Sequence, residues 1–219
     1  MKRATLCMGL ALAIVALASV AFAAENAITI NGGGQTVLMK APSVKVNQPY
    51  RHDPKLKTIY TNLGTGNDVY QSGTGWTISG SGSVVGELWT QGCAFKPKAN
   101  HTITKIEVGF TYVTGDPNSG TISLYSDKGG QPNKVIHNFP AVSNLPTFGD
   151  TGSVLQTVKD TKGIKVKKGT QYWLVLSAPD DTWDVWNLAN TATGNEAYNN
   201  GNGWTVRSVN LGAFAVLGK

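Results

Sequence analysis

Residues 168–187 read KGTQYWLVLSAPDDTWDVWN and contain two apolar runs. The first apolar run, Tyr172 to Leu176, places apolar side chains on both faces of any extended strand. A strand that is apolar on both faces is usually covered by other layers on both sides. Pro179 and the two aspartates after it favour a turn, and a second apolar run follows from Trp183 to Trp186. The stretch therefore predicts the hydrophobic centre of a β-sandwich.

Alternation within the first run also predicts which side chains share a face. Trp173 and Val175 are expected on one buried face, and Leu174 and Leu176 on the other. Three of the six tryptophans of the chain fall within this stretch, so we expect its two apolar runs to form a hairpin at the centre of the sandwich.

The chain from Thr58 onward consists of short apolar segments that are separated by glycine-rich turns. The most regular alternation runs from Thr102 to Val113, and Ile103 is out of phase with it, which predicts a β-bulge near Thr104–Lys105. Two Asn-Gly pairs between Tyr198 and Trp204 predict a tight turn. Turn signals at short intervals and no helical periodicity indicate an all-β fold. Residues 58–219 are therefore predicted to form one antiparallel, jelly-roll-like β-sandwich.

Residues 1–23 have the three parts of a secretory signal peptide. Lys2 and Arg3 precede an apolar run from Leu6 to Phe22, and small residues occupy the positions before a cleavage site after Ala23. The alternative is a membrane anchor, but the run is at the short end of the roughly 20 residues that a span requires. We expect a secreted protein, extracellular or at the cell surface, that contacts the membrane only through this segment during export.

Residues 24–57 are predicted to be a flexible, basic N-terminal arm. Ala27 to Ile30 could form a short strand, but three glycines follow it, and three prolines further along discourage regular pairing. Val37 to Met39 could dock on the domain. The arm carries most of the positive charge that remains after cleavage, and residues 58–219 have a net charge of only +1. Proteins that bind nucleic acid usually present a basic face, so we expect no nucleic-acid partner.

Seven short segments in a fixed order carry a family resemblance. They are Ile59–Gly64, Gly75–Trp76, Ser123–Asp127 with the Gly-Gly-x-Pro loop after it, Leu145–Gly149, Gly169–Trp173, Asp181–Asp184 and Leu211–Phe214. In this order they resemble the bacterial extracellular domain family called choice-of-anchor R. The resemblance implies a secreted or surface-displayed β-sandwich without established catalytic residues. Members commonly carry C-terminal sorting anchors such as the PEP-CTERM type, but this sequence ends directly after its last strand, so simple export is expected.

Motifs that would indicate catalysis are scarce. A glycosidase needs two carboxylates that face one sugar bond, and Glu87, Glu107 and Glu196 show no pattern that would pair them. The sequence has no nucleophile elbow, and its three histidines lack the spacing of a zinc motif. We therefore expect a non-catalytic domain, with a secreted glycan-active hydrolase that uses the sparse surface carboxylates as the alternative.

The densest acidic cluster comprises Asp180, Asp181 and Asp184. Calcium prefers several oxygen ligands from one loop, so these aspartates are candidate calcium ligands. A capped turn would explain the same residues, because no Gly-x-Asp repeat accompanies them. No other cofactor is expected.

Three tryptophans that lie beside glycine-rich loops or strand ends are candidates for sugar binding. Trp76, Trp186 and Trp204 could stack on sugar rings if their faces are exposed, and the Asn187 amide could add polar contacts. Core packing is the alternative for each of these rings. We predict weak, non-catalytic binding of an extracellular polysaccharide through aromatic residues near loops, with a matrix protein as the alternative partner.

Overall fold

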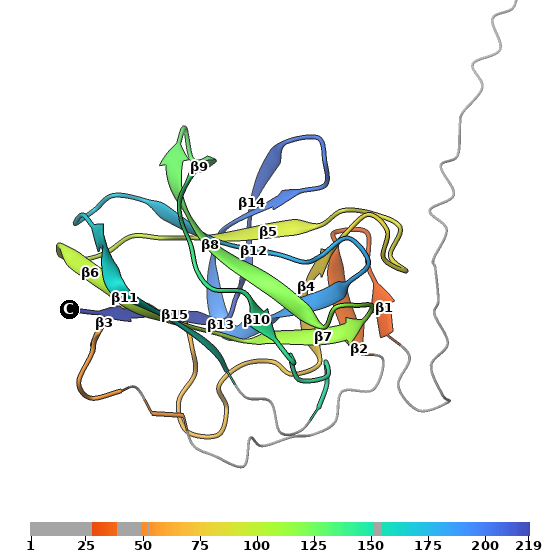
Figure 1. The fold of residues 1–219 in the computed structure, drawn as a ribbon, viewed down its shortest axis with the longest axis horizontal. Helices are drawn as coiled ribbons and strands as arrows, with labels where there is room; N and C mark the ends of the chain where they lie inside the picture. The colour runs from red at the N-terminus through yellow and green to blue at the C-terminus, as the bar shows by residue number, and fades with distance from the viewer. Residues whose placement is uncertain (1–27, 39–49, 52, 151–154) are drawn as a thin grey trace, which may run out of the picture.

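A computed structural model describes residues 28–38, 50–51, 53–150 and 155–219. Within these residues every element of secondary structure is a β-strand, and the strands form two antiparallel sheets (Figure 1). A helix with the length and hydrophobicity to cross a membrane does not occur in this described part of the chain. The predicted signal peptide lies outside the described residues.

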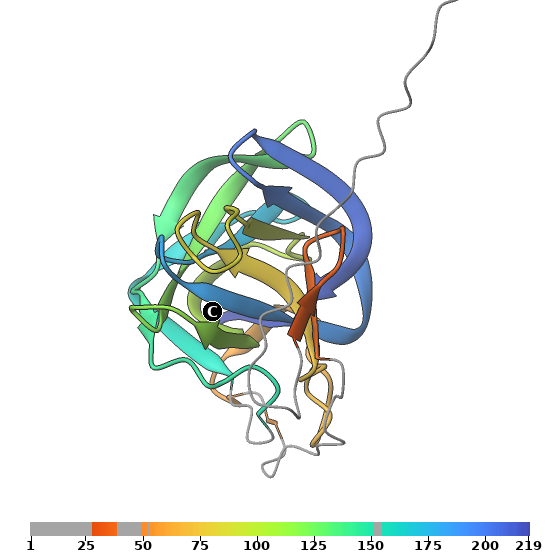
Figure 2. The same ribbon diagram turned by 90° about the vertical axis from the view of Figure 1, so that its right-hand side faces the viewer.

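The two sheets differ in size. The small sheet has the order β11-β6-β15-β3. Its strands are β3 (Lys57–Thr61), β6 (His101–Val108), β11 (Gln156–Val166) and β15 (Phe214–Gly218). The large sheet contains β1 (Ile28–Ile30), β2 (Gln35–Leu38), β4 (Thr74–Ser79), β5 (Thr90–Phe95), β7 (Phe110–Thr114), β8 (Ser119–Lys128), β9 (Gln131–Asn138), β10 (Val142–Ser143), β12 (Tyr172–Ser177), β13 (Trp183–Asn199) and β14 (Trp204–Gly212). The predicted all-β sandwich is therefore confirmed, and Figure 2 shows the strands wrapped around a common interior.

Strand β12 lies inside the large sheet, between β5 and β8. Leu174 and Leu176 point into the core between the sheets, whereas Trp173 and Val175 pack with Ala197 on the opposite face. The predicted assignment of the two faces is confirmed. The predicted hairpin is wrong, because β5 pairs with both β12 and β13 and separates them.

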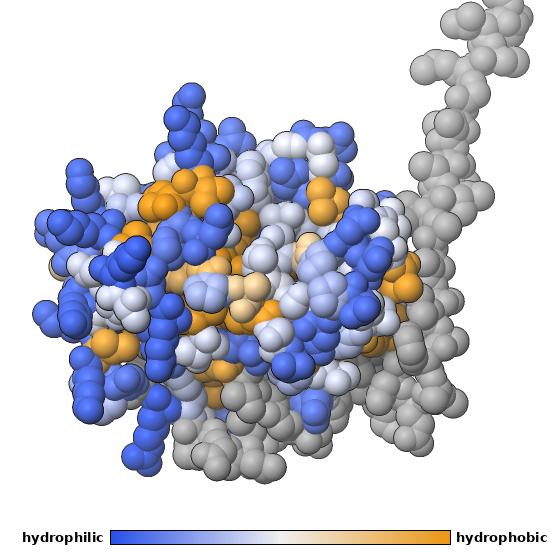
Figure 3. All heavy atoms as spheres, in the orientation of Figure 1, coloured by the Kyte–Doolittle hydropathy of each residue, from blue (hydrophilic) through white to orange (hydrophobic). Residues whose placement is uncertain are grey.

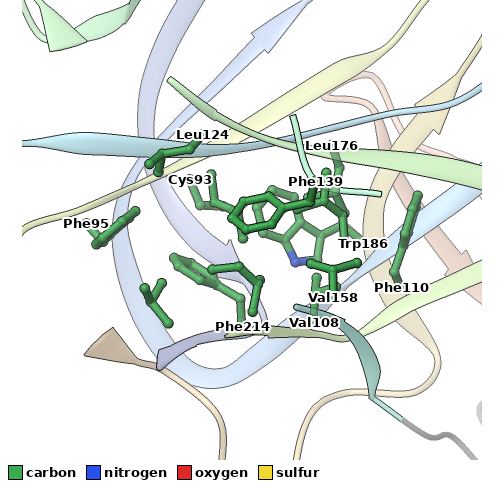
Figure 4. Close-up of a cluster of buried hydrophobic side chains, with 14 of the residues drawn as sticks. Cys93, Phe95, Val108, Phe110, Leu124, Phe139, Val158, Leu176, Trp186 and Phe214 are labelled. Carbon is green, nitrogen blue, oxygen red and sulfur yellow. The ribbon is translucent and has the colours of Figure 1, made fainter. Parts of the chain in front are cut away.

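The core between the sheets is built around Trp186 (Figure 4). The Trp186 ring lies 5.8 Å from the ring of Phe214 on β15, and Trp186 Nε1 donates a 3.1 Å hydrogen bond to the Ala213 carbonyl. A Cβ atom placed on Gly212 would lie 2.4 Å from the indole. Glycine is therefore required at this position because the ring occupies the space of a side chain.

The chain changes sheets at a junction of three segments. Gly109 separates β6 in the small sheet from β7 in the large one, and Ala213 separates β14 from β15 in the same way. Asn187 joins them: its backbone N–H donates to the Gly109 carbonyl (2.8 Å), and its carbonyl accepts from Ala213 N–H (2.8 Å). The run from Thr102 to Val113 is therefore two strands that belong to different sheets.

The predicted β-bulge is confirmed on β6. Lys105 is opposite Leu217 of β15, whereas Ile103 is opposite Gly218, so Thr104 is an extra residue in β6. Because the extra residue restores the phase, Ile103 reaches the core on the same side as Ile106.

Part of the predicted flexible arm belongs to the large sheet. β1 and β2 form a hairpin, and β2 pairs with β4. The Thr36 and Thr77 hydroxyls share a buried hydrogen bond of 2.8 Å across this pairing. The prediction of an arm without regular pairing is therefore wrong for residues 28–38, and residues 39–49 lie outside the described part of the chain.

The position of Leu174 makes a direct prediction for stability. Leu174→Ala is expected to lower the free energy of unfolding by about 2–5 kcal/mol, because a fully buried leucine leaves a cavity. Val84, with an exposed fraction of 53%, provides the control, and Val84→Ala should change stability by less than about 0.5 kcal/mol. Denaturant titration of both variants makes the comparison. Equal effects would mean that β12 is not a core strand.

Candidate binding surface

Two of the three candidate tryptophans are not on the surface. The exposed fraction of Trp76 is 5% and that of Trp186 is 0%, whereas Trp204 is half-buried. The expectation that Trp76 and Trp186 are exposed is therefore wrong. Gly212 lies beside Trp186 within paired strands and makes room for its ring.

Asn187 is buried, and its side chain serves the sheet junction. Its amide group donates hydrogen bonds to the carbonyls of Gln71 (3.0 Å) and Ser72 (3.2 Å), and its Oδ1 accepts one from the Thr111 hydroxyl (2.8 Å). All of these bonds are internal to the protein. The predicted contact between Asn187 and a ligand would require these bonds to break.

Trp76 belongs to an arginine–aromatic cluster that no sequence motif indicated. The Arg207 guanidinium lies 4.2 Å from the Trp76 ring centroid and 4.9 Å from that of Tyr198. The Trp89 ring lies 5.4 Å from the Tyr198 ring, and a Cβ atom on Gly34 would lie 2.7 Å from the Trp89 indole. The Trp76 ring is therefore covered by the guanidinium and has little exposed surface for a sugar, whereas Trp89 and Tyr198 are half-buried.

This cluster instead attaches the N-terminal hairpin to β14. Arg207 Nη1 donates a 2.7 Å hydrogen bond to the Gly33 carbonyl in the turn between β1 and β2. Arg207 Nε donates to Glu196 Oε2 at 2.5 Å. Arg207 is the single arginine of residues 58–219, and the Asn-Gly turn sets the register that pairs it with Glu196. The single arginine and the Asn-Gly turn together could have predicted the pair of Arg207 and Glu196 from the sequence.

Glu196 is a buried carboxyl group whose ionisation is disfavoured. Burial raises its pKa to about 7, although Arg207 acts in the opposite direction. Cys93 lies on the adjacent strand β5, opposite Glu196. Burial also raises the pKa of the Cys93 thiol, and its sulfur accepts a hydrogen bond from Gly212 N–H (3.3 Å). A neutral, buried thiol is a packing group, because the thiolate is the reactive form.

The three candidate calcium ligands have different surroundings. Asp180 is exposed and accepts hydrogen bonds from Ser81 Oγ (2.7 Å) and Gly82 N–H (3.2 Å). Asp181 is also exposed, whereas Asp184 is fully buried on β13. Among the described residues, no three His, Cys, Asp or Glu side chains are grouped so that they could hold a metal ion. The structure therefore does not gather the three aspartates, and calcium binding stays a prediction.

Asp184 has an unusual environment for a carboxylate. A Cβ atom on Gly120 would lie 3.2 Å from Asp184 Oδ2 and 2.3 Å from the Phe110 ring, so the carboxyl lies beside an apolar ring. Neither carboxyl oxygen has a hydrogen-bond partner among the residues that the structure describes. Burial raises the pKa of Asp184 to about 8.

The buried carboxyl groups do not form a glycosidase pair. Asp184 is opposite β4 and β7, whereas Glu196 is opposite β5 and β14, and both have an exposed fraction of 0%. Glu107 is buried too, with Lys105 and the Tyr50 hydroxyl as partners. A glycosidase needs two carboxyl groups that reach the same bond of a bound sugar. The hydrolase alternative therefore gains no support from these three groups.

An exposed aromatic and apolar surface lies on the outer face of the large sheet. The rings of Trp204 on β14 and Tyr125 on β8 meet edge to face at 6.1 Å. Val135 on β9 is opposite Tyr125, and Val206 shares a face of β14 with Trp204 by alternation. The exposed fractions of the two valines are 48% and 38%. We name these four residues the outer platform.

The surroundings of the outer platform are polar. The last residue of β13, Asn199, and the turn residues Asn200 and Asn202 lie near it, and Asn199 Oδ1 accepts a hydrogen bond from Gly201 N–H (2.8 Å). In Figure 3 hydrophobic residues gather near β9, with another such group toward the β14 hairpin, and hydrophilic residues surround them. Beneath the platform lie the buried side chains of Trp173 and Val175. The surface therefore combines a supported apolar patch with nearby amide groups.

Comparisons with known proteins do not extend the resemblance seen in the sequence. No family model, no curated protein and no solved structure matches the chain. Membership of the choice-of-anchor R family therefore stays a prediction.

Proposed function

We propose that this protein is a non-catalytic extracellular binding domain and that its outer platform holds a polysaccharide. The observation that carries the proposal is the pair of half-buried rings, Trp204 and Tyr125, together with two exposed valines on the same face of the sheet. The expected secretory signal and the resemblance to choice-of-anchor R domains support an extracellular or cell-surface location.

The chemistry of the outer platform suits a sugar better than a purely apolar ligand. A sugar ring has apolar C–H faces and polar edges, and aromatic side chains bury the faces while the edges remain free for hydrogen bonds. Asn200 and Asn202 are exposed beside Trp204 and can donate to hydroxyl groups. Because a shallow platform surrounds only one side of a ring, binding at each sugar unit is expected to be weak.

Trp204→Ala is expected to weaken polysaccharide binding about three- to tenfold, since an aromatic contact is worth roughly 0.5–1.5 kcal/mol. The melting temperature should change little because Trp204 is not fully buried. Glycan-array binding of the mature protein identifies a ligand, and titration with that glycan gives the affinity. Thr205→Ala, an exposed neighbour on the opposite face of β14, is the control and should bind like the wild type.

Three results of the same experiment would redirect the proposal. Release of reducing ends from the polysaccharide would support the hydrolase alternative. Failure to bind any glycan of a broad panel would contradict glycan binding and favour a matrix protein as the partner. Loss of binding after addition of EDTA would support a calcium site, for which Asp180 and Asp181 would be the first residues to replace.

A further inference from the structure

Five exposed lysines gather at one end of the sandwich. They are Lys96, Lys98, Lys165, Lys167 and Lys168, and we name them the lysine end. Backbone and side-chain hydrogen bonds hold their segments together: Gly169 N–H donates to the Pro97 carbonyl (2.9 Å), and Lys168 N–H donates to Asn100 Oδ1 (2.8 Å). Figure 1 places the start of β6 and the C-terminus at this end, and Figure 3 shows hydrophilic side chains that project from it.

The charges of the lysine end are not neutralised within the protein. The ion pairs among the described residues involve Lys105, His137 and Arg207, and none of the five lysines. The acidic residue on the adjacent strand β8 is Asp127, and its carboxylate already accepts hydrogen bonds from Gln171 (2.7 Å), Trp173 (2.8 Å) and Gly130 (3.2 Å). The charged side chains of the lysine end are therefore of one sign.

The opposite end of the sandwich is acidic. Three loops meet there through hydrogen bonds from Gly80 N–H to the Thr182 carbonyl (3.1 Å) and from the Thr182 hydroxyl to the Pro117 carbonyl (2.8 Å). These loops contain Asp116, Asp180 and Asp181. Residues 58–95, 106–127 and 169–206 contain no lysine or arginine. The near-zero net charge of the domain therefore conceals a strong separation of charge.

We infer that the lysine end binds the negative charges of an acidic polysaccharide. Exposed lysines of like charge repel one another, and this repulsion is relieved when a polyanion lies across them. One exposed ion pair contributes little on its own, whereas a polymer that places several anionic groups on neighbouring lysines adds their contributions. That the polymer is a polysaccharide rests on the proposed function. The inference adds a second binding surface and predicts that the ligand is negatively charged.

The composition of the lysine end favours a polysaccharide over a nucleic acid. Proteins that bind single-stranded nucleic acid combine basic residues with exposed aromatic rings on which the bases stack. At the lysine end the nearest aromatic residues of β5 and β12, Phe95 and Tyr172, are buried. None of its described residues is an arginine, the side chain that reads guanine edges in duplex DNA. A sugar acid requires only the positive charge.

Dextran and dextran sulfate of equal length test this inference, because they differ only in charge. We expect the mature protein to bind dextran sulfate more tightly, with an affinity that falls as sodium chloride rises from about 50 mM to about 500 mM. Lys165→Gln with Lys168→Gln should weaken this binding about tenfold and reduce its salt dependence. Arg51→Gln with Lys134→Gln removes the same charge from two exposed residues outside the lysine end and should weaken binding less than about twofold.

The outcomes separate this inference from the proposed function. Equal losses in the two double variants would show an effect of net charge alone and would overturn the lysine end as a site. Tighter binding of an oligonucleotide than of dextran sulfate, at matched charge and salt, would also overturn it. Trp204→Ala reports on the outer platform with neutral glycans, so loss of that binding alone leaves the lysine end intact. A failure of the lysine end likewise leaves the outer platform intact.

Discussion

Trp186→Ala is expected to lower the free energy of unfolding by about 3–5 kcal/mol, because truncation of a buried aromatic ring opens a large cavity. The ring has no exposed surface and packs against Phe214 from the small sheet. Its Nε1 also donates to the Ala213 carbonyl at the point where the chain changes sheets. The substitution therefore removes both a core side chain and a hydrogen bond of the junction.

Denaturant unfolding of Trp186→Ala and Trp204→Ala makes a matched comparison, since the chemical change is the same in both. Trp204 is half-buried at the surface, so its truncation should cost less than about 1 kcal/mol. Trp186→Phe keeps an aromatic ring and should lose less than Trp186→Ala. A loss below about 1 kcal/mol for Trp186→Ala would contradict the central position of this ring.

The features that the sequence predicted correctly are those that depend on local alternation. Leu174 and Trp173 could be assigned to opposite faces because successive side chains of a strand alternate. The bulge at Thr104 could be predicted because Ile103 breaks the period of its own strand. The turn before Trp204 could be predicted because Asn-Gly pairs adopt the required backbone conformations without help from other segments.

The errors concern pairing between distant segments. β5 lies between β12 and β13, which no local pattern indicates, because strand order is determined by the packing of the whole sheet. β2 is a strand because it pairs with β4, although the glycines before it indicated a break. Glycine and asparagine are typical of loops, yet Gly212 lies against the buried Trp186 ring and Asn187 lies at the junction where the chain changes sheets.

The candidate site shows the same limit. Trp204 could be predicted, but its partner Tyr125 comes from β8, far away in the sequence. The five lysines could not be predicted as a group either, because the segments that contain Lys98 and Lys168 come together only when β5, β6, β11 and β12 assemble. A net charge says nothing about where the charges lie.

Asp184→Asn is expected to stabilise the protein at neutral and alkaline pH. The Asp184 carboxyl is fully buried and lacks a hydrogen-bond partner among the described residues, and burial raises its pKa from 3.8 to about 8. At a pH above this value the folded protein must hold a buried, unpaired charge, which is costly. The amide of asparagine occupies nearly the same volume and carries no charge at any pH.

The sign and the pH window of this effect follow from proton binding. Between about pH 4 and pH 8 the folded protein keeps the proton that the unfolded chain has lost, so the stability of the wild type falls as the pH rises. In Asp184→Asn this contribution disappears, and its advantage over the wild type should grow by up to roughly 1.4 kcal/mol for each pH unit across the window. The raised pKa of Glu196 acts in the same direction and remains in the variant, so some pH dependence persists.

Urea unfolding of the wild type and Asp184→Asn across this pH window measures the difference. Asp180→Asn is the control, because hydrogen bonds from Ser81 and Gly82 lower the pKa of this exposed carboxyl. The stability that Asp180 contributes is present at neutral pH and is lost as the pH falls through its folded-state pKa, so its removal should act with the opposite sign. Parallel stability curves for the wild type and Asp184→Asn would show that Asp184 ionises in the folded protein as it does in the unfolded chain. A hydrogen-bond donor or a positively charged group would then have to contact the Asp184 carboxylate in the folded protein.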